Sequence, residues 1–390
     1  LAYIGIVIIL GTVIGIILEK SGAAITMADA VLKVVGKKRP ALAMSIIGYI
    51  VSIPVFCDSG YIILASLKKS MGRKAGASAV TMSIALATGL YATHTLVPPT
   101  PGPIAAAGNL GLENHLGLVI LFGIGISVVT VGAGYLWACF IGKRVTCGED
   151  LEPVTLDEAT LRDRVGRLPG VFKAFSPIFV PIILIAFASV VGFPSNPLGQ
   201  GGLAQAILFA GRPLNALLIG FGLALRLLPG FNKETLTDWI GEGLKAAAII
   251  IMITGAGGAF GAILKATPIG DYLGQSLSSW HMGIVLPFIM AAALKTAQGS
   301  STVALVTTSA LVAPLLATLG LDSVTGRVLT VMATGAGAMT VSHANDSYFW
   351  VVTQFSKMDV STAYKSHTMA TLIQGLATLA VVILLSLILL

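Results

Sequence analysis

Apolar runs close to the length that crosses a lipid bilayer recur along the whole chain. The clearest are residues 1–18, 116–142, 176–192, 203–225 and 368–390. About 20 apolar helical residues span the hydrocarbon core of a membrane. Only 11% of the 390 residues are charged, whereas soluble domains carry about 25%. The sequence therefore predicts an all-α polytopic membrane protein.

A further apolar region is interrupted at residues 91–109, YATHTLVPPTPGPIAAAGN. Its prolines are Pro98, Pro99, Pro101 and Pro103. Each proline lacks a backbone donor and disfavours helical dihedrals in the residue before it. Interrupted backbone at bilayer depth is tolerated only where it is buried in protein or lines a cavity. We therefore expect a discontinuous transmembrane helix here, and with it a candidate site.

Two basic clusters, at residues 33–39 and 68–74, flank the mainly apolar residues 40–67. That segment is too short for two spans of about 20 residues each. Because Lys and Arg favour the cytoplasmic side, we expect both clusters there. Residues 40–67 then form a re-entrant hairpin, with its tip at 54–60, PVFCDSG, where Asp58 lies.

The second half of the chain repeats this pattern. Two pairs of short matches share one spacing: Gly15-Ile-Ile-Leu18 with Gly261-Ala-Ile-Leu264, and Ala87-Thr88-Gly89 with Ala333-Thr334-Gly335. A second hairpin is expected at 283–318, with the polar tip 295–302, and a second broken helix around 342–347. Counting spans gives the two copies opposite orientations, so we predict two inverted-topology repeats of the kind found in secondary transporters.

This organisation divides the chain into four parts. They are a first membrane repeat at 1–142, a cytoplasmic loop at 143–175, connecting transmembrane helices at 176–239 and the second, inverted repeat at 240–390. The net charge of +7 comes from Lys and Arg in short loops, which form no basic face for nucleic acid. Residue 1 is Leu inside an apolar run, so we expect the natural chain to start further upstream.

Five ionisable residues fall at membrane depth, each at a hairpin tip or helix break: Asp58, His94, Lys295, His343 and Asp346. Such groups face a cavity or a partner because exposure to lipid costs several kcal/mol. A proton-coupled carrier needs a group that titrates near neutrality, which a histidine or a desolvated carboxylate provides. The two acids and two histidines are therefore the candidates for proton coupling. The alternative is that these groups only satisfy the broken backbone or one another.

An anionic substrate needs hydrogen-bond donors, which hydroxyls, amides and the backbone of helix N-termini supply. The candidate substrate-binding residues are Thr95, Thr100, Gly102, Asn109, Lys295, Gln298, Gly299, Ser300, Ser301, Thr302, Asn345 and Ser347. A packing interface between helices is the alternative for 299–302, since small residues also allow close helix contact. The three cysteines have no metal-binding or CxxC spacing, so we expect no metal or other cofactor.

Four motifs together resemble the gluconate permease family of bacterial proton-coupled sugar-acid carriers. They are VFCDSGYIIL at 55–64, HTLVPPTPGP at 94–103, AQGSSTVALVTTSA at 297–310 and SHANDSYFW at 342–350. The resemblance covers essentially the whole chain in order. It implies uptake of gluconate or a related small hydroxy or amino acid carboxylate with a proton across the bacterial cytoplasmic membrane. Through the wider ion-transporter superfamily, it also implies an elevator movement and a homodimer embedded in lipid.

By position, Asp58 matches the acid of the family's first motif, and His94 begins the proline-rich one. Two residues depart from the family pattern. Thr100 stands where a second histidine is common, and Lys295 stands where arginine is usual. Lysine is a point charge and cannot grip a carboxylate with a bidentate fork, so the substrate or its mode of binding is expected to differ.

Other functions remain open at this point. A sodium-coupled carrier of a carboxylate or D-amino acid would use the same architecture, because unwound carbonyls and carboxylates also suit Na⁺. A membrane-embedded enzyme could use His and Asp as a base and its orienting partner, yet the sequence has no HExxH or GxSxG motif. A passive channel would need no paired tips with titratable groups.

Overall fold

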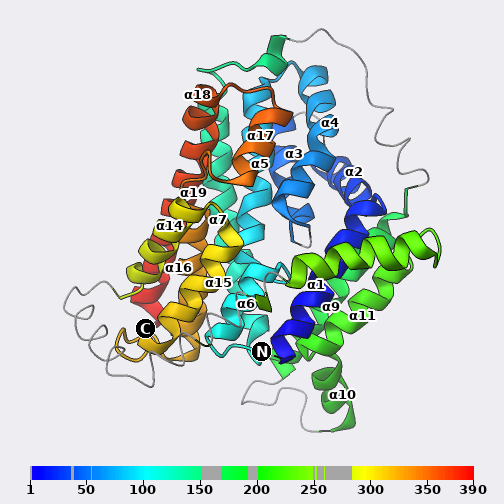
Figure 1. The fold of residues 1–390 in the computed structure, drawn as a ribbon, viewed down its shortest axis with the longest axis vertical. Coiled ribbons are helices and arrows are strands. Elements are labelled where there is room, and N and C mark those ends of the chain that lie inside the picture. Colours follow the sequence, from blue (N-terminus) through cyan, green and yellow to red (C-terminus); the bar gives the residue numbers. More distant parts are fainter. Residues whose placement is uncertain are drawn as a thin grey trace.

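A computed structural model describes residues 2–36, 39–53, 55–151, 168–191, 201–248, 251–252, 259 and 283–390. Every regular element within these ranges is a helix (Figure 1). The structure therefore confirms an all-helical architecture.

Three helical stretches are long and apolar enough to cross a membrane among the described residues: Ala79–Asn109, Leu116–Ile141 and Val360–Leu389. Two bent pairs raise the number to five if each pair forms one span. These pairs are Gly5–Lys20 with Ala23–Val31, bent by 75°, and Gly202–Ala210 with Pro213–Leu225, bent by 68°. The chain is therefore an integral membrane protein, as its apolar runs predict.

The first half contains a short helical pair followed by a broken helix. The elements are α3 (Pro40–Val51), α4 (Cys57–Ala75), α5 (Ala79–Leu96), α6 (Pro101–Asn109) and α7 (Leu116–Ile141). The helical interruption covers only 97–100, so it is shorter than the expected 91–109. Pro101 begins α6, where a missing backbone donor is harmless. The basic residues at 68–74 belong to α4 and not to a loop, so the second arm of the hairpin is longer than expected.

The second half repeats this order of elements. Here α14 (Val285–Gln298) and α15 (Ser301–Val312) form the short pair, and η3 (Ala313–Leu315) follows. The broken helix consists of α16 (Val324–Met339) and α17 (Ser347–Phe355), and the last span of α18 (Val360–Ala363), η4 (Tyr364–Thr368) and α19 (Met369–Leu389). In Figure 1, α3, α4 and α17 lie in the upper part of the molecule, and α6 and α15 in the lower part. Of the repeat matches, both triplets lie in helices that precede a break, whereas 261–264 lies outside the described residues.

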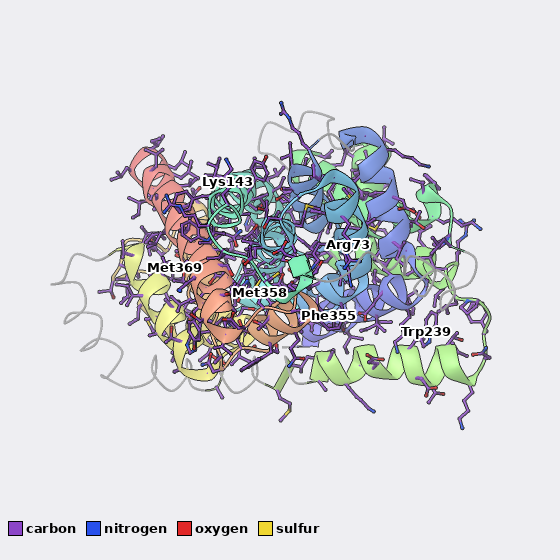
Figure 2. All side chains as sticks on the ribbon, turned by 90° about the horizontal axis from the view of Figure 1, so that it is seen from above. Arg73, Lys143, Trp239, Phe355, Met358 and Met369 are labelled. Carbon is purple, nitrogen blue, oxygen red and sulfur yellow. The ribbon has the colours of Figure 1, made fainter. Side chains whose placement is uncertain are left out.

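The remaining helices lie to one side of these two halves (Figure 1). They are α1 (Ala2–Lys20), α2 (Ala23–Val35), α9 (Val171–Val191), α10 (Gly202–Ala210) and α11 (Pro213–Leu225). A further helix, which includes η2 (Glu234–Trp239), runs along the edge of the molecule, where Figure 2 labels Trp239. Glu242 on this helix forms an ion pair of 2.6 Å with Lys20 of α1. Residues 152–167 of the expected cytoplasmic loop 143–175 lie outside the described residues; η1 (Gly148–Leu151) precedes them, and α9 begins at Val171, before the expected end of the loop.

A buried group of polar side chains connects the two halves at the upper end through Ser356. The Lys68 ammonium lies 2.6 Å from the Glu149 carboxylate, and also donates to Ser83 of α5 at 3.0 Å and Ser356 at 3.2 Å. The hydroxyl of Tyr61 lies 2.6 Å from that of Ser356. Figure 2 views the molecule from above, with Arg73 of α4 and the neighbours of Ser356 in the sequence, Phe355 and Met358, labelled. We call Tyr61, Lys68, Ser83, Glu149 and Ser356 the upper polar cluster.

Candidate functional site

Both hairpin tips and both helix breaks meet inside the molecule. The tip of the second hairpin contacts the second break so closely that a side chain on Gly299 would lie 2.1 Å from the carbonyl oxygen of Asn345. Gly299 also has a φ of 87°, which only glycine adopts readily. The first break reaches the same tip through Gly102, which lies against Thr302. Small residues therefore bring the second tip against both breaks.

The first hairpin joins the same place through Asp58, in the first turn of α4. The hydroxyl of Ser347 donates to the Asp58 carboxylate at 3.3 Å. Ser347 opens α17, directly after the second break. The predicted residues Asp58 and Ser347 therefore lie together although 289 positions separate them in the sequence.

A buried ion pair between Lys295 and Asp346 lies at the centre of this meeting place. Their side chains are 1% and 5% exposed, and the ammonium donates directly to the carboxylate. Lys295 also donates to the carbonyl of Gly299 at 2.6 Å. Asp346 caps α17 by accepting the N–H of Tyr348 at 3.0 Å, and it accepts the hydroxyl of Ser342 as well. Each buried charge is thus balanced and hydrogen-bonded, which burial requires.

At the second break and the second tip, polar side chains form hydrogen bonds with nearby backbone groups. At the second break, Asn345 donates its amide to the carbonyl of Thr296 at 2.7 Å, and the His343 ring nitrogen Nε2 lies 3.2 Å from the same oxygen. At the tip, the side chain of Gln298 bridges the backbone of Ser300, with distances of 2.7 and 3.1 Å. Since Gln298 and Asn345 are exposed, their remaining hydrogen-bonding capacity is open to a ligand.

His94 lies at the end of α5 in an aromatic setting. Its ring is stacked on Tyr91 at 6.4 Å and tilted against Phe56 at 5.8 Å. The side chain is buried, and its Nδ1 has no hydrogen-bond partner within the described ranges of the chain. Tyr91 in turn packs at 5.0 Å against Tyr348, which adjoins Asp346. His94 therefore borders the ion pair through two rings and does not touch it.

The other predicted residues of the first break satisfy backbone groups. Thr95 donates to the carbonyl of Tyr91 in its own helix at 3.1 Å, and Thr100 donates to that of Val97 at 2.6 Å. Asn109 donates to Val306 and Ser309 of α15, both at 3.0 Å, further along the helix from the tip. Among the predicted residues of the second tip, Ser300 caps α15 through the N–H of Val303, and Ser301 and Thr302 form the first turn of α15.

His367 is the main member of the site that the motifs did not reveal. It lies in η4, fully buried, with its Nε2 3.2 Å from the hydroxyl of Ser342. In the sequence it stands just before the apolar run 368–390, so it was not counted among the residues at membrane depth. The signal in the sequence that could have pointed to His367 is a histidine one position before an apolar run.

Comparisons with known proteins identify the family of the chain. Residues 1–388 match the model of the family described as GntP family permease. The gluconate permease of Pseudomonas aeruginosa is 32% identical over 398 residues, covering 100% of this chain and 86% of that protein. The D-serine transporter DsdX of Escherichia coli K12 is 32% identical over 393 residues, covering 99% and 85%.

The fold is similar to a solved one, the crystal structure of the Alcanivorax borkumensis YdaH transporter. That match has a TM-score of 0.54 and 13% identity, and it covers 98% of this chain and 84% of the other. The family and the relatives are transporters and not enzymes. The match along residues 1–388 confirms the resemblance that the four motifs indicate, and the chain belongs to the GntP family of permeases.

Proposed function

We propose that this permease carries gluconate or a related small hydroxy- or sugar-acid carboxylate into the cell together with a proton. The observation that carries the proposal is the buried ion pair of Lys295 and Asp346 where the tips and breaks meet. A cation that faces one carboxylate can face another of similar shape. Lys295 is therefore the group that takes the substrate carboxylate.

The same pair couples the substrate to the proton. While Asp346 is ionised, it occupies the Lys295 ammonium and excludes a second carboxylate from it. Protonation of Asp346 removes that charge, and the substrate anion then restores the balance that a buried ammonium needs. Of the four coupling candidates, Asp346 is favoured because it contacts the lysine directly. The exposed amides of Gln298 and Asn345 and the N-terminus of α15 supply donors for the substrate hydroxyls.

The architecture that goes with this function is a pair of inverted repeats in the bacterial cytoplasmic membrane. The repeated order of a short helical pair and a broken helix supports it, as do the opposite ends at which α6 and α17 lie in Figure 1. We infer an elevator movement of the two halves, fastened by the upper polar cluster, against the helices around α1, α9 and α11. A homodimer is part of the same proposal, and the mass of the detergent-solubilised protein tests it.

A D-amino acid is the second candidate substrate, favoured by the similarity to a protein named as a D-serine transporter. Such a substrate has the carboxylate that Lys295 would bind and an ammonium in place of a hydroxyl. Sodium is the second candidate for the coupling ion, since carbonyls at helix breaks suit it. One experiment on purified protein distinguishes the D-amino acid and the sodium ion from the proposed substrate and the proton.

The experiment measures uptake into proteoliposomes under an imposed pH gradient in sodium-free buffer. Substrates are first chosen by thermal shift against sugar acids, small hydroxy acids and D-amino acids. Accumulation of a hydroxy or sugar acid, with alkalinisation of the acidic side, is the expected result. Uptake that requires sodium, or that selects only amino acids, would replace the proposal with the corresponding alternative.

A further inference from the structure

Ser342 in the second break is held by three side chains of the last transmembrane helix. Thr371 accepts the Ser342 N–H at 2.9 Å, and Thr368 donates to the Ser342 carbonyl at 2.6 Å. His367 approaches the Ser342 hydroxyl at 3.2 Å. These three side chains share one face because positions i+3 and i+4 lie together on a helix. His367 and Thr368 belong to η4, residues Tyr364–Thr368, a π-helical turn, and such turns often occur at functional sites.

The direction of the hydrogen bonds among His367, Ser342 and Asp346 follows from which of these groups can donate a proton. The Ser342 hydroxyl has one proton, and it donates this proton to the ionised carboxylate of Asp346. Its oxygen must therefore accept a hydrogen bond, and the Nε2–H of His367 is placed to donate one. A continuous line of hydrogen bonds thus runs from His367 through Ser342 to Asp346.

The imidazole of His367 is not needed to hold Ser342 in position. Thr368 and Thr371 already fix both backbone groups of Ser342. His367 is fully buried, and its Nδ1 has no partner among the described residues. Burying an unpartnered polar atom is unfavourable, so its presence here suggests a use that the static structure does not fulfil. Histidine is the side chain whose ordinary pKa suits proton transfer near neutrality.

We propose that His367 delivers the coupling proton to Asp346, and takes it back, through the hydroxyl of Ser342. In delivery, the Nε2–H bond of the imidazolium breaks as the proton joins Ser342 Oγ. At the same time the original Oγ–H bond breaks as that proton joins Asp346 Oδ2. The imidazolium becomes a neutral imidazole with its proton on Nδ1, the carboxylate becomes a neutral acid, and the total charge is unchanged. This proposal rests on the proton coupling described above.

The surroundings of His367 are consistent with this role. From α17, the rings of Tyr348 and Phe349 lie at 5.3 and 6.3 Å, and from α5, Tyr91 lies behind Tyr348. α7 meets the turn through Trp137, which donates to the Ser366 carbonyl at 2.9 Å. The charges that act on His367 are Asp346 and Lys295, and η4 itself carries the side chains of Tyr364 and Lys365. The acid that the relay serves is thus one of the two charges that act on His367.

The decisive variant is His367→Gln, since a glutamine amide can still donate to Ser342 but cannot ionise. We expect substrate counterflow, which needs no net proton movement, to stay close to the wild-type rate. Accumulation driven by a pH gradient should fall on the order of 100-fold, the usual effect of a positioned acid–base group. Ser342→Ala, which interrupts the same line, should give the same separation of counterflow from accumulation.

Thr368→Val is the matched control. It removes a hydrogen bond to Ser342 but leaves the relay intact, so its pH profile should follow that of the wild type. Wild-type accumulation by His367→Gln would overturn the relay. Equal loss of counterflow and accumulation in His367→Gln and Thr368→Val would assign a positional role only, and also overturn it. If the wild type itself causes no substrate-dependent alkalinisation, the proposed proton coupling fails, whereas alkalinisation by both wild type and His367→Gln removes the relay alone.

Discussion

Asp346→Asn separates the charge of Asp346 from its structural contacts. Asparagine caps a helix about as well as aspartate, so the bond from the Tyr348 N–H, which is 3.0 Å in the wild type, should survive. The lost feature is the negative charge that faces Lys295. The variant therefore imitates the protonated carrier permanently.

The expected magnitude follows from the burial of the pair. Removing one partner of a buried ion pair costs about 3–5 kcal/mol, because the other charge is left without compensation. A bound carboxylate restores that compensation, so substrate should stabilise the variant by more than it stabilises the wild type. In the proposed mechanism, the wild type takes up one proton with each carboxylate. The Kd should then rise about tenfold for each pH unit over the range in which binding takes up this proton, which is about 1.4 kcal/mol per unit.

The assay measures the Kd of purified protein across neutral pH, together with counterflow and gradient-driven uptake in proteoliposomes. Asp346→Asn should bind substrate with a Kd that does not change with pH, retain counterflow and lose accumulation. Asp359→Asn is the matched control, because Asp359 also caps a helix, α18, through the N–H of Thr362 at 2.8 Å. A pH slope in Asp346→Asn equal to that of the wild type, or accumulation at the wild-type level, would refute the reasoning.

Variants at three other places test separate parts of the structure by changes in thermal unfolding. Gly299→Ala should weaken both folding and uptake, because its methyl group would lie 2.1 Å from the Asn345 carbonyl and its φ of 87° disfavours alanine; full activity would contradict the contact. Lys68→Met should destabilise by about 3–5 kcal/mol, and Lys68→Met with Glu149→Gln by less, which a double-mutant cycle measures. Asp359→Ala should destabilise by about 0.5–2 kcal/mol at neutral pH. Hydrogen bonds from Thr362 lower the pKa of the Asp359 carboxyl, so this difference is present above its ordinary pKa and disappears as the pH falls through the lowered value.

Local sequence patterns predicted the elements of this fold better than their ends. The prolines after Val97 and the polar tip at 295–302 located a break and a hairpin, because these features act on neighbouring backbone. The second arm of the first hairpin ended too early in the prediction. The charge of Lys68 predicts a position at the end of the hairpin, whereas its burial depends on Glu149, 81 positions away. Local sequence patterns do not reveal an ion-pair partner that is so far away in the sequence.

In the candidate site too, the residues that a local pattern marks were predicted, and the one that depends on distant partners was missed. The motif residues Asp58, Lys295 and Asp346 were predicted from charge at membrane depth, and the structure brings them close to one another. His367 was missed because its meaning depends on Ser342, 25 positions earlier, and on a π-helical turn. The functional roles of all these residues stay predictions until the variants are measured.

The upper polar cluster has a consequence for how the protein is made. Lys68 is synthesised long before Ser356, which lies 288 positions later and completes its surroundings. During that interval Glu149 already balances the charge of the lysine, whereas the Ser356 hydroxyl is still missing. The first half can therefore bury Lys68 with its own partners, but the hydrogen bonds of Lys68 and Tyr61 to Ser356 form only after the second half has been inserted. Fragments that divide the chain in the region of 192–200 should be degraded more slowly in cells when produced together than when produced singly.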